Sequence, residues 1–224
     1  MATYDLEEQE QLAEIKVWWK QYGNLLVNVL TAAALLVIAW QGWNWYQRNQ
    51  TAQASLVYNV LQKAVVDKDT QRIKAASGEL VEKFGGTGYA SLGAMMTAKA
   101  MLDGADEKTA KLQLLWVVDH GKDELRDLAR LRLAAVLLDE KAYDQALQQL
   151  DGTVSPSFAA RFADNRGDVL SARGKKAEAI AAYQAALAKL DETGRQGNEG
   201  WEGQSQAVYR ELVQQKLDAL GGAK

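Results

Sequence analysis

The residues that most often carry chemistry are scarce in this chain. It has no cysteine and a single histidine, His120, which stands directly before Gly121. The common catalytic dyads and zinc sites need a second histidine or a cysteine beside such a residue. We therefore expect His120 to lie at the C-terminal end of a helix, where its charge would complement the helix dipole. Gly121 would then supply a left-handed C-cap.

Two other patterns could bind a charged ligand, and neither has the required spacing. The glycine run GGTG at 85–88 lacks the Lys-Ser/Thr pair of a phosphate loop. The carboxylates Asp103, Asp106 and Glu107 do not follow a calcium loop, so we interpret them as a turn and a helix start. The sequence thus predicts a protein that is not an enzyme and that binds no metal and no cofactor.

The charge balance excludes a further class of partner. Residues 1–24 carry five carboxylates and two lysines, which accounts for the whole net charge of −3, and the rest of the chain is balanced. A nucleic-acid-binding protein would show a basic patch or stripe. We expect no nucleic-acid partner.

Aromatic residues flank the one long apolar segment of the chain. Indole settles where hydrocarbon meets headgroups, so aromatic belts mark the two edges of a membrane span. No charge occurs between Lys20 and Arg48, and residues 25–45 give 21 residues, enough to cross a bilayer. We predict a transmembrane helix over 25–45. The residues predicted to contact lipid at its edges are Trp18, Trp19, Tyr22, Trp40, Trp43 and Trp45.

Two alternatives to a membrane anchor fit the sequence less well. A buried helix of a soluble domain would not collect aromatics at both ends. A cleavable signal has a short basic leader and small residues at its cleavage site, whereas this leader is long and acidic and bulky tryptophans follow the segment. Lys16 and Lys20 against Arg48 place the N-terminus inside by two charges to one. Residues 12–22 form an amphipathic helix along the inner leaflet, or a simple extension of the span.

Beyond Arg48 the sequence predicts helices only. It has one proline, Pro156, and apolar residues recur at three and four. Breaks separate the segments at DKD (67–69), GGTG (85–88), DGAD (103–106), HGKD (120–123), DEKA (139–142), DGTVSP (151–156), RGKK (173–176) and GRQGNEGWEG (194–203). Short helices therefore follow one another as antiparallel pairs.

Those pairs repeat on a grid of small residues. Ala110, Ala146 and Ala179 stand 36 and 33 residues apart, close to the roughly 34 of a tetratricopeptide repeat. We expect these alanines, and the preceding small residues Ala98, Ala134 and Gly167, to lie where two helices cross, with Gly174 in a turn and a fourth unit centred on Ala75. Tyr183 and Ala186 would pack toward the next pair.

The fold prediction is all-α, with one N-terminal transmembrane helix followed by a tetratricopeptide-like helical-repeat solenoid over 46–224. Residues 204–220 would form a capping helix whose apolar face holds Val208, Leu212, Val213, Leu217 and Leu220. Helix 124–139 is apolar nearly all round, so it lies at the centre of the solenoid or exposes part of its apolar surface.

A solenoid presents a concave surface lined by the first helix of each pair. The repeat grid places two sets of residues there: Leu128, Leu131, Ala135 and Leu138, then Arg161, Asp164, Asp168 and Ser171. A groove that is part apolar and part acidic suits an extended polypeptide or a partner's helix. Alternatively, these are ordinary packed or solvated faces. Trp201 is an exposed anchor or folds back onto the capping helix.

The whole chain, from about residue 4 to 220, resembles the YfgM-like family of Gram-negative bacteria, the ancillary subunit of the Sec translocon. The resemblance rests on EIKVWWKQYGN, the exit WQGWNWYQ, the ASLVY start of the soluble part, and RGDVLSARGKKAEAIAAYQAAL. The long loop 191–203 is an elaboration on the family pattern.

The resemblance implies an inner-membrane protein with a cytoplasmic N-terminus (1–24) and a periplasmic repeat domain. It implies association with Sec channel subunits and a membrane-anchored periplasmic prolyl isomerase, and help for exported polypeptides on their way to periplasmic chaperones. It offers no catalytic residue. The alternative function is an assembly factor or scaffold for another envelope complex, such as outer-membrane-protein or cell-wall machinery.

Overall fold

The computed structural model describes residues 2–194 and 201–222. Nine α-helices and one 3-10 helix account for nearly all of these residues, and none of them lies in a strand. The all-α prediction is confirmed. The chain divides into two compact units, residues 1–52 and residues 53–224, which are taken separately below.

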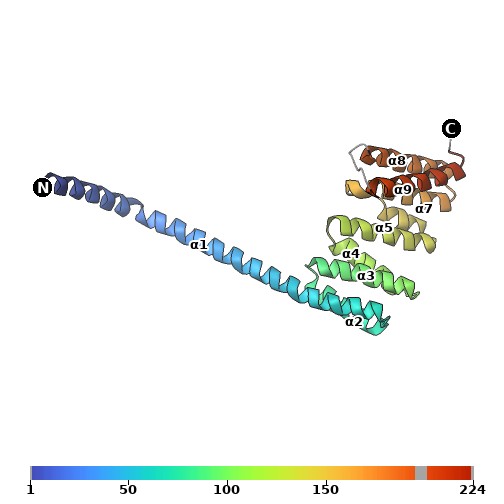
Figure 1. Ribbon diagram of the computed structural model, residues 1–224, viewed down its shortest axis with the longest axis horizontal. Helices are drawn as coiled ribbons and strands as arrows, with labels where there is room; N and C mark the ends of the chain where they lie inside the picture. The colour runs from blue at the N-terminus through green and yellow to red at the C-terminus, as the bar shows by residue number, and fades with distance from the viewer. Residues whose placement is uncertain (1, 195–200, 223–224) are drawn as a thin grey trace. The chain divides into compact units, whose positions relative to one another are not determined.

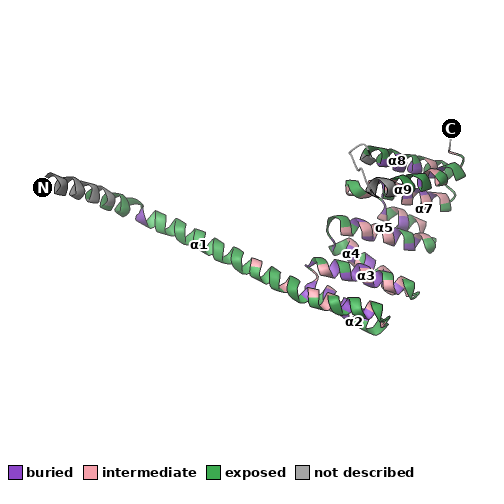
Figure 2. Ribbon diagram, viewed as in Figure 1, coloured by how far each residue is buried: buried purple, intermediate pink, exposed green. Residues whose placement is uncertain are grey.

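Residues 2–52 of the first unit are helical throughout, and the apolar side chains that the structure describes there are exposed. These residues belong to α1, Ala2–Val66. Among the described residues this is the one helix long and apolar enough to cross a membrane, and 6% of its most apolar window is buried. Figure 2 shows this stretch almost entirely as exposed. A core helix of a soluble domain would bury that surface, so the helix is available to lipid.

The six aromatics predicted at the membrane edges are all exposed, from 43% for Tyr22 to 68% for Trp45. Their contact with lipid, and the limits 25–45 of the span, stay predictions. The predicted amphipathic segment 12–22 is part of α1, but the side chains of residues 1–12, 14 and 15 lie outside the described part of the structure.

The second unit is a stack of helix pairs (Figure 1). The end of α1 pairs with α2, Thr70–Phe84. Then α3, Gly88–Asp103, pairs with α4, Glu107–His120, and α5, Asp123–Asp139, with the short α6, Tyr143–Gln149. After the 3-10 helix η1, Pro156–Phe158, α7, Ala159–Ala172, pairs with α8, Lys176–Gly194, and α9, Trp201–Ala219, completes the stack.

Helix ends fall where the turn residues predict them. Asp69 and Asp106 cap α2 and α4, each accepting a hydrogen bond from a backbone N–H three residues on, at 3.1 Å. Gly174 has φ of +81° in the turn between α7 and α8, as expected of a glycine there. The final predicted break is shorter, since α8 reaches Gly194 and α9 begins at Trp201; the remaining residues 195–200 and the side chain of Trp201 lie outside the described part.

The small-residue grid is where the helices cross. Ala98, Ala110, Ala134, Ala146 and Ala179 are all buried to 1% or less exposure. Gly167 lies so close to Tyr183 that a Cβ there would be 2.4 Å from the tyrosine ring. The fourth unit was predicted one residue out of register: Ala75 is exposed, and Ala76 is the buried residue.

One further expectation needs correction. Gly121 is not a left-handed cap, because its φ is −67° and its ψ is 155°. A Cβ at Gly121 would instead meet the Val117 carbonyl oxygen at 2.5 Å, so close approach requires the glycine. His120 is exposed and stacks on Trp116, with ring centroids 4.8 Å apart. Helix α5 does lie inside the stack, packed by α4, α6 and α7.

Candidate interaction surface

The first helices of the second and third pairs present matching faces. On α3 the residues spaced three and four apart on this face are Tyr89, Leu92, Met96, Lys99 and Asp103. On α5 they are Leu125, Leu128, Arg132, Ala135 and Asp139. All ten side chains are exposed or half-buried. We call these ten residues the first-helix face. Each stripe begins apolar and ends on an acidic residue, so successive helices repeat the same polarity.

Two hollows adjoin this face. One, of about 390 Å³, lies between the α1–α2 turn and α3, and its lining includes Val65, Lys68 and Met96. The other, of about 510 Å³, lies between α3 and α5. Lys99 and Asp103 line both hollows, and they form a salt bridge of 3.0 Å with each other. The two hollows are therefore neighbours that share one wall.

The hollow between α3 and α5 combines apolar walls with charges of both signs. Leu102, Leu114 and Val136 supply apolar surface. The charged residues at the same hollow are Lys99, Asp103, Glu107, Arg132 and Asp139. Apolar side chains can take up the side chains of a bound polypeptide, and the charges can meet its polar groups. The geometry thus favours a peptide-like ligand over a small reactive substrate.

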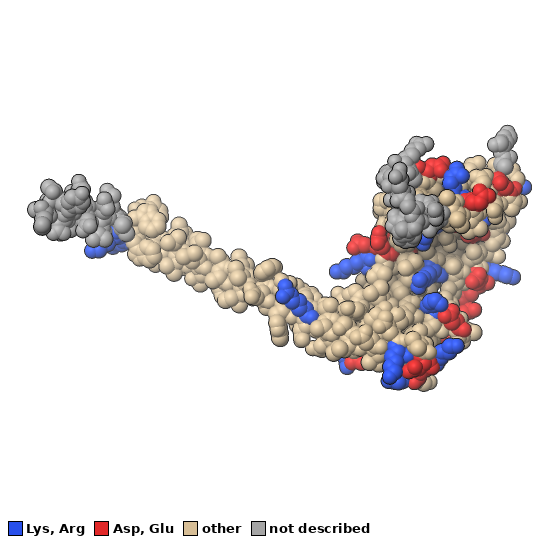
Figure 3. Space-filling view, viewed as in Figure 1, with Lys and Arg blue, Asp and Glu red and all other residues tan. Residues whose placement is uncertain are grey.

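Charge is mixed across the repeat unit. Figure 3 shows blue and red side chains interspersed over the repeat helices, and a stretch of α1 with almost no charge. Within the described residues, no group of three or more His, Asp or Glu side chains is arranged to hold a metal ion. The mixture of charges agrees with the charge balance of the sequence.

The structure separates the residues that the repeat grid placed in one groove. Ala135 is exposed and lines the hollow beside α3. Leu131 is buried, and Leu128 and Leu138 are half-buried against the core. On α7, Arg161 is exposed, Ser171 and Asp168 are half-buried and Asp164 is 3% exposed. Their role in binding a partner stays a prediction.

The two α7 carboxylates are occupied by α9. Lys216 Nζ donates to Asp164 Oδ1 at 2.9 Å and to Asp168 Oδ2 at 2.8 Å. The Tyr209 hydroxyl donates to Asp164 Oδ2, and the Tyr183 hydroxyl to Asp168 Oδ1, both at 2.8 Å. We call these five residues the α9 clasp. Sequence reasoning missed Lys216 because it stands 48 and 52 residues from its partners.

The apolar face predicted for the capping helix is only partly buried. Val213 and Leu217 are buried at 0% and 4% exposure, and Leu220 is half-buried. Val208 and Leu212 are 73% and 48% exposed, so they face away from the core. Helix α9 therefore rests on two fully buried apolar side chains and the polar clasp.

The contacts within the α9 clasp change the pKa values of Tyr183, Tyr209 and Lys216. Burial, followed by the neighbouring aspartates, raises the pKa of both Tyr183 and Tyr209. Burial lowers the pKa of Lys216, but hydrogen bonds to Asp168 and Asp164 outweigh it and the net pKa is raised. All three shifts favour the protonated forms in the folded chain.

Alkali should therefore destabilise the C-terminal end of the repeat unit. The stabilisation from Lys216 is complete below about pH 10.4, its pKa when unfolded, and is lost as the pH rises through the raised value. The unfolded chain also releases tyrosine protons above about pH 10 before the folded chain does. We expect the free energy of unfolding, measured with urea, to fall from about pH 10 upward. Equal steepness in a Lys216→Met, Tyr209→Phe variant would contradict this account.

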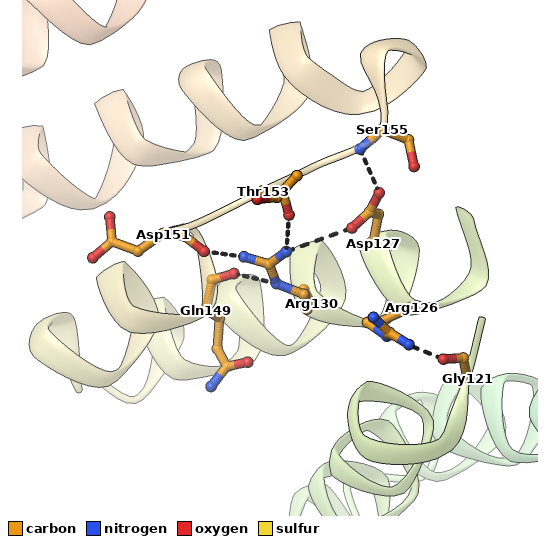
Figure 4. A network of polar contacts seen from close by, with 8 residues as sticks. All are labelled: Gly121, Arg126, Asp127, Arg130, Gln149, Asp151, Thr153 and Ser155. Atoms are coloured by element: carbon orange, nitrogen blue, oxygen red, sulfur yellow. Dashed lines mark hydrogen bonds and ion pairs between the residues drawn. The ribbon is translucent and has the colours of Figure 1, made fainter. Parts of the chain in front are cut away.

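A second buried polar network orders the connection between α6 and α7 (Figure 4). The Arg130 guanidinium donates to the carbonyl oxygens of Gln149 at 2.9 Å, Thr153 at 3.0 Å and Asp151. Asp127 accepts from the Ser155 backbone N–H at 2.8 Å and pairs with Arg130 at 3.5 Å. Sequence analysis did not single out Asp127 and Arg130, because charged residues are not expected to be buried.

Comparison with known proteins decides the family. A family described as a tetratricopeptide repeat-like domain matches residues 16–222. The ancillary SecYEG translocon subunit of Neisseria gonorrhoeae is 33% identical over 220 residues, covering 96% of this chain and 98% of that protein. The chain belongs to the family of ancillary SecYEG translocon subunits. The resemblance stated from the sequence is confirmed.

Two more members of the ancillary SecYEG translocon subunit family agree over most of their length. The Haemophilus influenzae protein is 30% identical and covers 82% of this chain and 90% of its own. The Escherichia coli protein is 29% identical and covers 84% and 90%. The names of these relatives state their own association with the SecYEG translocon. Within the described residues of this chain, α1 is the helix long and apolar enough to cross a membrane.

Proposed function

We propose that this chain is a membrane-anchored, non-enzymatic interaction protein of the Sec translocon. The observation that carries the proposal is the combination of an exposed apolar helix with a repeat unit whose first-helix face stays open. Such a protein acts by position, because the anchor keeps the repeat unit at the membrane where an exported chain emerges. The names of three relatives, each an ancillary SecYEG translocon subunit, support this proposal.

The proposed topology is N-terminus cytoplasmic and repeat domain periplasmic, in the bacterial inner membrane. Lys16 and Lys20 before the apolar segment, against Arg48 after it, support this orientation. A reporter that is active only in the periplasm, fused after Lys224, should be active. A fusion active only in the cytoplasm would reverse the topology.

The proposed partners are channel subunits of the translocon and a membrane-anchored periplasmic prolyl isomerase. Exported polypeptides on their way to periplasmic chaperones would meet the hollows beside α3 and α5. Their apolar walls and two-signed charges support binding of unfolded chain without sequence preference. A secondary site for partner binding is proposed at the α7 residues predicted for the groove, which are Arg161, Asp164, Asp168 and Ser171.

Purification in mild detergent tests this proposal. The wild-type chain should bring down channel subunits and the isomerase. Ala135→Glu places a charge in the hollow beside α3, so we expect it to lose the partners that bind there and to keep its thermal unfolding unchanged. Ala185→Glu is the matched control, since Ala185 is an exposed alanine on α8.

The proteins recovered in this experiment distinguish an interaction protein of the Sec translocon from an assembly factor of another envelope complex. Recovery of both partners by wild type and the control, with loss in Ala135→Glu, supports the proposal. Recovery of an outer-membrane-protein or cell-wall assembly complex in place of channel subunits would overturn it in favour of an envelope assembly factor.

A further inference from the structure

The joint between α9 and the last repeat pair differs in chemistry from the inner joints. On the repeat register, Asp164 of α7 corresponds to Leu131 of α5, Met95 of α3 and Leu61 of α1. Those three side chains are apolar and buried, at 7%, 5% and 0% exposure. Asp164 is equally buried, at 3%, but carries a carboxylate. At this register position the last joint therefore has a charged side chain, whereas the inner joints have apolar ones.

Within the described residues, both hydrogen-bond partners of the Asp164 side chain lie on α9. Lys216 bonds one oxygen of Asp164 and Tyr209 the other. Arg161 on α7 lies over the Tyr209 ring, 5.9 Å from its centroid, and Lys216 lies 5.8 Å from that of Tyr183. Side chains of α7 and α8 that lie beneath α9 thus bind one cation and one aromatic ring and form a receptor for both.

Separating the helices at a polar joint of this kind costs less free energy than separating them at an apolar joint. Opening an inner joint would expose apolar surface at about 25 cal/mol per Å². Separating an ion pair returns both charges to water, which recovers the desolvation cost paid on closing. Among the α9 residues whose burial the structure describes, 206–219, only Val213 and Leu217 are buried apolar side chains. In a stack of repeats the end unit also has a neighbour on one side only.

We infer that the α7–α8 surface beneath α9 is a binding site for an amphipathic helix that presents a lysine or arginine among apolar residues, with α9 as its resident occupant. The pattern that fits is an aromatic residue followed at four, seven and eight positions by an apolar residue, a cation and an apolar residue, as in Tyr209, Val213, Lys216 and Leu217. A partner helix of this pattern competes with α9. The site is distinct from the hollows beside α3 and does not depend on the Sec association.

A synthetic peptide of residues 201–222 serves as the probe. It carries a fluorophore and is titrated, by anisotropy, into the full-length chain in detergent. In Lys216→Glu the resident helix is repelled by Asp164 and Asp168, while the receptor itself is intact. We expect this variant to bind the peptide about tenfold more tightly than the wild-type chain does. High salt should weaken binding.

Three controls show whether the receptor chemistry is responsible. Arg210→Glu reverses another α9 cation, whose pair with Asp191 is exposed on both sides, and should leave peptide binding at the wild-type level. A peptide with Lys216→Glu should bind the Lys216→Glu chain about tenfold more weakly than the wild-type peptide. Adding Asp168→Asn to that chain should also weaken binding.

Hydrogen exchange completes the test. In Lys216→Glu, the amides of α9 should exchange faster while those of α3 to α8 keep their protection. If the variant unfolds more widely, Val213→Ala weakens α9 without touching the carboxylates and takes its place. Protection of α9 equal to that of α5 in these variants, or failure of the peptide to bind an opened chain, would overturn the inference.

Discussion

Replacing Arg130 with alanine should cost about 3–5 kcal/mol of the free energy of unfolding. The guanidinium is 12% exposed and its partner Asp127 is 7% exposed. The change would leave a buried carboxylate without its cation and remove the donor from three backbone carbonyls between α6 and α7. It would also remove the guanidinium from the face of Phe162, 4.8 Å away. Each loss acts on the connection between the third and fourth pairs.

Arg126→Ala is the matched control, one turn earlier on the same helix (Figure 4). Arg126 is exposed and donates to one carbonyl oxygen, that of Gly121, at 3.0 Å. Its loss should cost less than about 1 kcal/mol. Urea unfolding followed by circular dichroism measures both variants, and hydrogen exchange should show α7 and α8 opening before α3 in Arg130→Ala. Similar costs for the two arginines would contradict the network as drawn.

Gly167→Ala should destabilise the repeat unit by about 1–3 kcal/mol, although alanine is the better helix former. A Cβ at this position would lie 2.4 and 2.6 Å from two ring carbons of Tyr183. The ring cannot move aside freely, because it is 3% exposed and its hydroxyl is bonded to Asp168. Helices α7 and α8 must therefore separate, which loosens the last pair.

Gly78→Ala is the control for helix propensity. Gly78 lies inside α2, and a Cβ there would meet nothing within 4 Å. The same substitution should therefore stabilise the protein, by about 0.5–1 kcal/mol. Thermal unfolding of the two variants should shift in opposite directions. A stabilised Gly167→Ala would show that α7 and α8 have room to spare at their crossing.

Local patterns in the sequence were enough for most of the fold. Gly167, Ala134 and Ala179 have the spacing of helix crossings, because only small side chains let the two helices approach each other closely there. Turn residues such as Asp69 and Gly174 mark helix ends through capping and backbone conformation, which are short-range effects. Gly121 misled the prediction, since a glycine before a helix can serve close approach as well as a left-handed cap.

The site was harder to predict than the fold. The repeat grid predicted Asp164 and Asp168 at the concave surface, whereas helix α9, which follows later in the chain, covers them. The Asp127 carboxylate accepts its hydrogen bond from the backbone N–H of Ser155, which is 28 residues away in the sequence. These contacts join groups that are distant in sequence and belong to no periodic pattern. By contrast, Ala135 was predicted at the surface because helix periodicity alone exposes it.

Photocrosslinking from Ala135 in living cells tests the central claim most directly. A photoreactive residue at 135, in the hollow beside α3, should capture a channel subunit of the translocon, the membrane-anchored isomerase or an exported polypeptide. The same residue at Ala185 on α8 serves as the control and should capture far less. Capture from position 185 alone, or of cytoplasmic proteins only from position 135, would contradict a periplasmic interaction surface on the first helices.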